Sequence, residues 1–118
     1  MSTILIAEDD SAVRSMLEVV LERQGHRVVP VGGGHECLEQ LGATDIDLVI
    51  LDVEMPMLDG WDTLAAIRAS SAVPVILLTA LAGDDHLQRS VDRGADAFIS
   101  KPFINGDLVS TVARLLDR

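Results

Sequence analysis

The sequence contains a single cysteine, Cys37, among its 118 residues, so the chain cannot form an internal disulfide. It begins Met-Ser-Thr-Ile-Leu-Ile-Ala, without the basic region or the length of a secretory signal peptide. Disulfides are common in secreted proteins and rare in the cytosol, where thiols are kept reduced. We therefore expect the protein to work in the cytoplasm.

Basic residues are also scarce, because nine Lys and Arg stand against nineteen Asp and Glu and give a formal net charge of −10. Binding to nucleic acid or to anionic lipid relies on a basic surface, so this composition argues against both. No apolar run approaches the roughly 20 residues needed to cross a bilayer, and no tract has low complexity. The charge favours proteins and cations as partners.

Hydrophobic residues make up 48% of the chain, which is enough for one buried core, and we expect one domain over residues 1–118. Short apolar runs, typical of buried strands, alternate with segments whose apolar residues have helical spacing. The five expected strands are residues 3–7, 27–31, 48–51, 74–78 and 97–100. The expected helices contain residues 13–21, 37–41, 61–67, 87–91 and 108–116.

Helix caps and stripes follow from the same pattern. Asp10 or Ser11 is expected to cap the first helix, and Asn105 the last one, because these side chains accept backbone N–H bonds. The buried stripe of the first helix should include Met16 and Leu17, and that of the last helix consists of Leu108, Val112, Leu115 and Leu116.

Five alternations of strand and helix predict an α/β fold, with a parallel sheet, right-handed crossovers and helices on both faces. The simplest doubly wound solution has the flavodoxin-like strand order 2-1-3-4-5. In that order the first and third strands are neighbours at the point where the order reverses. Ligands bind at such a point, in the crevice outside the carboxyl ends of the strands.

Five reactive side chains are expected at this crevice. They are Glu8 and Asp9 after the first strand, Asp52 after the third run, Thr79 after the fourth and Lys101 after the fifth. Capping or a turn explains each one singly. Together, the crowded carboxylates repel one another unless a cation lies among them, and oxygen ligands with room for water suit Mg²⁺. Beside such an ion Asp52 can attack phosphorus as a nucleophile, while Lys101 and Thr79 stabilise phosphoryl oxygens.

These residues belong to four motifs that occur in order along the chain. They are Ile-Leu-Ile-Ala-Glu8-Asp9-Asp10, Leu-Asp52-Val-Glu-Met-Pro56-Met-Leu-Asp-Gly60, Pro-Val-Ile-Leu-Leu-Thr79-Ala80 and Gly94-Ala-Asp-Ala-Phe98-Ile-Ser-Lys101-Pro102-Phe103. With them the whole chain resembles the receiver domain of two-component response regulators. The resemblance implies that Asp52 accepts a phosphoryl group from a His of a sensor histidine kinase or phosphotransfer protein. Such a domain catalyses only its own phosphorylation and slow dephosphorylation, so it is not an enzyme for other substrates.

The resemblance also implies a metal site and a backbone feature. Mg²⁺, or Mn²⁺ in its place, is expected on Asp9, Asp52 and the backbone carbonyl of Glu54, with Glu8 acting through water. Many members have Asp where this chain has Glu8. The peptide bond between Lys101 and Pro102 is expected to be cis. Before modification, Lys101 should pair with Asp52.

A switch is the third implication. Thr79 is drawn toward the phosphoryl group, Phe98 turns inward behind it, and the surface of the fourth helix, fifth strand and last helix changes. A partner protein or an output domain would respond to that surface, and homodimerisation through it is left open. Glu54 and Leu81 each lie two residues beyond a site residue. Our hypothesis is that both lengthen the lifetime of modified Asp52.

Two other classes share part of this pattern. A phosphohydrolase of the haloacid dehalogenase type also forms a phosphoaspartate, but it needs a second Asp where this chain has Glu54. A flavodoxin-like flavin carrier has the same fold, but Glu8-Asp9-Asp10 would repel the flavin phosphate. The end at Arg118 fits a stand-alone receiver or, slightly better, a piece of a longer regulator. The run Gly32-Gly33-Gly34 has no functional explanation in the sequence.

Overall fold

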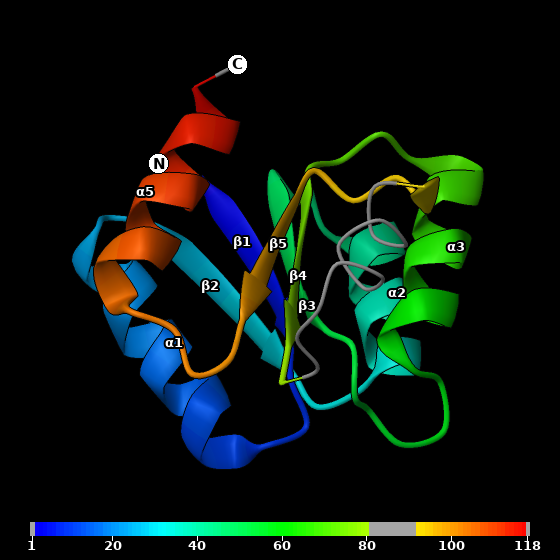
Figure 1. The fold of residues 1–118 in the computed structure, drawn as a ribbon. Helices are drawn as coiled ribbons and strands as arrows, with labels where there is room; N and C mark the ends of the chain where they lie inside the picture. The colour runs from blue at the N-terminus through cyan, green and yellow to red at the C-terminus, as the bar shows by residue number, and fades with distance from the viewer. Residues whose placement is uncertain (1, 81–91, 118) are drawn as a thin grey trace.

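The computed structural model describes residues 2–80 and 92–117 of the chain. The elements, in order, are β1 (Thr3–Ala7), α1 (Ser11–Arg23), β2 (Arg27–Val31), α2 (Gly34–Ala43), β3 (Leu48–Asp52), α3 (Gly60–Ser70), β4 (Val75–Thr79), β5 (Ala97–Ser100) and α5 (Asn105–Leu116). The strands form one parallel sheet in the order β2-β1-β3-β4-β5, which confirms the predicted fold class and strand order (Figure 1). The helix expected around Leu87 and Val91, and the residue Leu81, lie outside the described residues.

Helices cover both faces of the sheet, and alternate side chains of each strand pack against different helices. Leu5 and Ala7 of β1 face the cluster that contains α2 and α3, whereas Ile4 and Ile6 face α1 and α5. Figure 1 shows these two pairs of helices on opposite sides of the sheet. Strands β3 and β4 are buried along their whole lengths because they lie inside the sheet. Burial on both faces explains why their sequences are continuous apolar runs.

Helix α1 begins at the first acidic loop. The Asp10 carboxylate accepts hydrogen bonds from two backbone N–H groups of the first turn, at 2.9 and 3.2 Å, so the expected cap is present. Leu17 and Leu21 are fully buried, whereas Met16, expected in the same stripe, is 38% exposed. Adjacent helical residues differ in direction by about 100°, so Met16 lies at the edge of the stripe that faces the sheet.

Helix α5 corrects the expected cap. Asn105 is the first residue of the helix, and Ile104 has the N-cap position without a side-chain cap. The Ile104 carbonyl already accepts N–H groups from the first turn at 3.0 and 3.3 Å, so the helix starts too early for Asn105 to cap it. The inward stripe is as predicted and consists of Leu108, Val112 and Leu115, with Leu116 partly buried. Within the described ranges no helix is both long and apolar enough to cross a bilayer.

Two helices begin with a glycine because another segment lies against their first turn. A Cβ on Gly34 would collide with Thr63 Oγ1 and lie 2.8 Å from the Leu58 carbonyl oxygen, so a larger residue would separate α2 from α3. A Cβ on Gly60 would collide with the carbonyl oxygen of Asp52. Close packing therefore explains the last glycine of the 32–34 run, for which the sequence offered no reason.

Candidate functional site

The acids that follow β1 and the acid that ends β3 meet at the carboxyl edge of the sheet. Ala7 pairs with Leu51, so the residues after Ala7 lie beside Asp52. One carboxylate oxygen from each of Glu8, Asp9 and Asp52 lies within 4.8 Å of the others. The structure thus brings together the three acids that the sequence placed in one crevice.

The three acids differ in their contact with solvent. Glu8 and Asp52 are each 1% exposed, whereas Asp9 is exposed. Burial, reinforced by the negative charge of Glu8 and partly opposed by the ammonium of Lys101, raises the pKa of Asp52 to about 8. An ionised Asp52 is costly in this environment, and a nearby cation would favour it.

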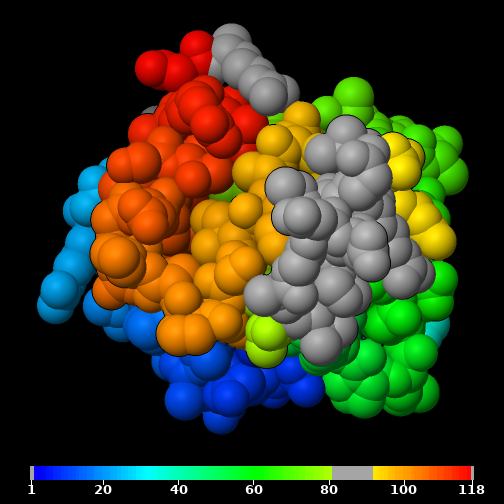
Figure 2. All heavy atoms as spheres, viewed as in Figure 1, coloured from blue at the N-terminus to red at the C-terminus, as the bar shows by residue number. Residues whose placement is uncertain are grey.

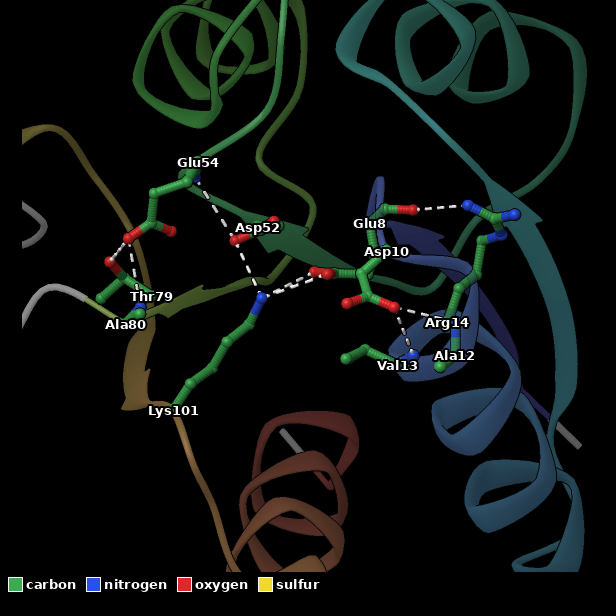
Figure 3. A network of polar contacts seen from close by, with 10 residues as sticks. All are labelled: Glu8, Asp10, Ala12, Val13, Arg14, Asp52, Glu54, Thr79, Ala80 and Lys101. Carbon is green, nitrogen blue, oxygen red and sulfur yellow. Dashed lines mark hydrogen bonds and ion pairs between the residues drawn. The ribbon is translucent and has the colours of Figure 1, made fainter.

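Lys101 reaches these acids from the loop after β5 (Figure 3). Its Nζ lies 3.1 and 3.0 Å from the two carboxylate oxygens of Glu8 and 3.2 Å from Asp52 Oδ1. Burial lowers the pKa of Lys101, but hydrogen bonding to Glu8 and the charges of both acids outweigh burial and raise it. The pairing with Asp52 was expected, and the pairing with Glu8 was not. The peptide bond between Lys101 and Pro102 is cis.

Glu54 makes the contact that sequence reasoning missed. Its Oε1 accepts hydrogen bonds from Thr79 Oγ1 at 2.5 Å and from the Ala80 backbone N–H at 3.1 Å (Figure 3). Glu54 and Thr79 are 25 positions apart, so no local spacing indicates the contact. The only available signal was the neighbouring position of the third and fourth strands in the expected sheet. The backbone N–H of Glu54 also donates to Asp52 Oδ1, at 3.3 Å.

Other residues near the site have structural roles. Asp10 caps α1, and Arg14 Nη1 donates to the backbone carbonyl of Glu8 at 2.8 Å. Phe98 is partly buried and packs against the core cluster that contains α2 and α3. Packing alone therefore accounts for Phe98 in this structure, and its part in a switch stays a prediction.

An apolar hollow of about 380 Å³ adjoins the site. Its lining residues are Val13, Met16, Ala80, Lys101, Pro102 and Phe103. In Figure 2 the orange spheres of the segment after β5 lie next to the blue spheres of α1, and the hollow is formed between these two segments. A larger groove, of about 830 Å³, lies between α2 and α3 near the amino end of β3, away from the three acids.

The arrangement suits phosphoryl transfer better than acid–base chemistry on a small molecule. It combines a carboxylate nucleophile with oxygen ligands for a hard cation, an ammonium and a hydroxyl. Phosphoryl transfer needs mostly positioning and the stabilisation of charge on the phosphoryl oxygens, which these groups can supply.

Comparisons with known proteins agree with this chemistry. The sequence model of the response regulator receiver domain matches residues 4–113. The transcriptional regulatory protein AfsQ1 of Streptomyces coelicolor is 37% identical over 118 residues, which are 100% of this chain and 52% of AfsQ1. The transcriptional regulatory protein CpxR of Escherichia coli is also 37% identical, over 100% of this chain and 50% of CpxR. The chain thus spans about half the length of these curated relatives.

A solved structure of a receiver domain is also similar to this chain. The receiver domain of the Francisella response regulator 1452 superposes with a TM-score of 0.96 at 28% identity, and the match covers 100% of this chain and 98% of that one. The similarities in sequence and structure do not support the haloacid dehalogenase alternative.

Proposed function

The chain belongs to the response regulator receiver domain family, and on that premise we propose that Asp52 is its phosphoacceptor. The supporting observation is the place of Asp52: a carboxylate that is 1% exposed, with two other acids within 4.8 Å and an ammonium at 3.2 Å. The phosphoryl donor is a His of a sensor histidine kinase or of a phosphotransfer protein. An Asp52 oxygen bonds to phosphorus as the bond from phosphorus to the donor nitrogen breaks, and that nitrogen takes up a proton.

The oxygen donors at this edge fit Mg²⁺, with Mn²⁺ as an alternative. Three carboxylates lie within 4.8 Å of one another, and the exposure of Asp9 leaves room for the waters that Mg²⁺ retains. Asp9, Asp52 and the backbone carbonyl of Glu54 would bind the ion, and Glu8 would act through water. When bound, the ion supplies positive charge against the phosphoryl oxygens.

Lys101 and Thr79 have separate tasks in this proposal. The Lys101 ammonium, which contacts both Glu8 and Asp52, would move its contact to a phosphoryl oxygen. The Thr79 hydroxyl would donate to another phosphoryl oxygen, and Phe98 would turn inward behind it. The surface that includes β5 and α5 would then change and control a partner or an output domain. Glu54 and Leu81 would set the lifetime of the modified state; Leu81 lies outside the described residues.

The whole protein is proposed to be a regulator that joins this domain to an output domain. AfsQ1 and CpxR are about twice as long as the matched segment and are transcriptional regulatory proteins, so control of transcription is the end effect we favour. With a net charge of −10, this domain itself would not bind DNA. Two modified domains could pair through the surface of β5 and α5. A buried thiol at Cys37 suits the expected cytoplasmic location.

Chemical modification tests the proposal directly. The wild type should take up one phosphoryl group from acetyl phosphate, and bind beryllofluoride, only when Mg²⁺ is present. Asp52→Asn should do neither, as measured by intact mass and by NMR. Modification that persists in Asp52→Asn would refute the assignment. A turnover assay with a phosphomonoester separates a receiver, which does not turn it over, from a hydrolase, which does.

A further inference from the structure

Glu54 contacts two donors that come from consecutive residues at the end of β4. The Thr79 hydroxyl lies 2.5 Å from Glu54 Oε1 and the Ala80 N–H nitrogen lies 3.1 Å from the same oxygen (Figure 3). Thr79 is fully buried, whereas Glu54 is an exposed residue of the loop after β3. The Thr79 donor therefore belongs to the buried end of β4, Ala80 is the exposed residue that follows it, and the Glu54 carboxylate reaches both from an exposed position.

The two donors form an anion-binding arrangement. Both point to one negatively charged oxygen, and hydrogen bonds to a charged acceptor are stronger than those to a neutral one. Strand β4 pairs with β3 so that Leu78 lies opposite Asp52. Thr79 and Ala80, the next two residues, therefore lie at the edge of the sheet where Asp52 would carry a phosphoryl group.

We propose that the Glu54 carboxylate is a resident anion, which occupies the Thr79 hydroxyl and the Ala80 N–H until a phosphoryl group on Asp52 replaces it. The inference rests on the proposed role of Asp52. It makes Glu54 a positioning residue, because the carboxylate acts through Thr79 and Ala80 rather than on phosphorus. Modification of Asp52 is then an exchange of one anion for another at the same donors.

Charge and exposure explain why the exchange runs in this direction. A phosphoryl group carries about −1.5 to −2 charges and three strong acceptor oxygens, against one charge on a carboxylate. The two anions repel each other at close range. Glu54 is exposed, so water can hydrate its carboxylate after release. The contact of Glu54 with Thr79 stabilises the unmodified domain, and removing it should make modification easier.

Glu54→Asp is the decisive variant because it keeps the charge but shortens the side chain by one methylene, out of reach of the two donors. If the contacts matter, Glu54→Asp and Glu54→Ala should both bind beryllofluoride roughly tenfold more tightly than the wild type at saturating Mg²⁺, the effect of losing one competing charged hydrogen bond. Trp61, the only tryptophan, and NMR can report the titration. Glu22→Asp, the same change at an exposed residue near the far end of α1, is the control.

Tenfold tighter binding by Glu54→Ala alone would mean that only the charge of Glu54 repels the ligand, and that result would overturn the inference. Unchanged binding by both Glu54 variants would do the same. A wild type that binds no beryllofluoride would overturn the proposed function, and this inference with it.

A second measurement needs neither metal nor beryllofluoride. In the unmodified domain the Ala80 amide donates to Glu54, so its hydrogen exchange should be roughly tenfold faster in Glu54→Asp, since the loss of one charged hydrogen bond changes an opening equilibrium by that factor or more. Glu22→Asp should leave it unchanged, and circular dichroism should show the same fold in each variant. An Ala80 exchange rate equal to that of the wild type would overturn the resident-anion role even if Asp52 is the phosphoacceptor.

Discussion

Lys101 places its ammonium between two acids, 3.0 Å from Oε2 of Glu8, which follows β1, and 3.2 Å from Oδ1 of Asp52, which ends β3. Both acids are 1% exposed, so neither carboxylate can rely on water for stabilisation. One ammonium can balance only one of the two carboxylates, and burial together with the charge of Glu8 raises the pKa of Asp52 to about 8. A further cation would therefore stabilise the ionised form of both acids, which is the physical basis of the expected Mg²⁺ site.

Replacing Lys101 by Met should leave two buried acids without their cation. We expect Lys101→Met to lower the free energy of unfolding by about 1–3 kcal/mol in EDTA, less than for a fully buried pair because protonation of Asp52 offsets part of the loss. Added Mg²⁺ should restore more stability to the variant than to the wild type. Urea unfolding measures both effects, and Arg23→Gln, at the exposed end of α1, is the control. Equal responses to Mg²⁺ would contradict this electrostatic account.

The pKa of Asp52 predicts a pH dependence of stability. Burial first, and then the charge of Glu8, raise this pKa from 3.8 to about 8. Between these values the folded state holds a proton that the unfolded state has lost, so protonated Asp52 contributes stability that is complete below pH 3.8 and is lost as the pH rises toward 8. In EDTA, the unfolding free energy of the wild type should thus fall between pH 5 and pH 8, whereas that of Asp52→Asn should not show this fall. The reason is that the folded wild type releases one proton over this range that the unfolded chain has already lost. Parallel profiles in urea unfolding would refute it.

Gly60 is predicted to be required at the back of the site. A Cβ there would collide with the Asp52 carbonyl oxygen and lie 3.0 Å from the Asp52 carbonyl carbon. Gly60→Ala should cost about 1–3 kcal/mol of stability, as overpacking does, and should weaken beryllofluoride binding because it displaces Asp52. Gly106→Ala in α5 is the matched control, because a Cβ at Gly106 would meet no atom within 4 Å. If both variants unfold at the same urea concentration, the close approach of Asp52 to Gly60 does not restrict the residue at position 60, and the prediction is wrong.

The fold could be predicted because its signals are local. Each strand inside the sheet is a short run of branched aliphatic residues, such as 48–51, and Asp10 and Gly25 mark the ends of a helix with regular spacing. Alternation then leaves few arrangements, so the convergence of Glu8 and Asp52 followed from the order of the strands. Asn105 was misplaced by one residue because sequence spacing does not fix a helix start to better than one or two positions, and in the structure the Ile104 carbonyl accepts the first helical hydrogen bonds.

The remaining features depend on distances that only the folded chain sets. The contact of Glu54 with Thr79 depends on the register of β3 and β4, in which Asp52 pairs with Leu78. A glycine is needed at position 34 because α2 approaches Leu58, a residue of a loop that is distant in the sequence. No periodicity encodes either distance, so sequence spacing could nominate these residues but could not pair them.

If the phosphoryl donor is a protein, as proposed above, we expect it to dock at the hollow beside Lys101. Its wall includes Met16, a residue of α1 that is 38% exposed although apolar. An apolar depression next to a reactive group is suited to the side chains of a partner, because burying it removes apolar surface from water. A partner seated there would bring its His to the edge of the sheet near Asp52, whereas acetyl phosphate is too small to need the hollow.

Met16→Asp should therefore slow transfer from a phosphorylated histidine phosphotransfer protein roughly tenfold or more, the effect of one lost interface anchor. It should leave the rate with acetyl phosphate unchanged, because the acids and Lys101 are intact. Val19→Asp is the matched control, since Val19 is a 46% exposed residue of the same helix and does not line the hollow. Radiolabel transfer and stopped-flow fluorescence measure the two rates. Equal slowing by both variants would show that added negative charge on α1, and not the hollow, controls docking.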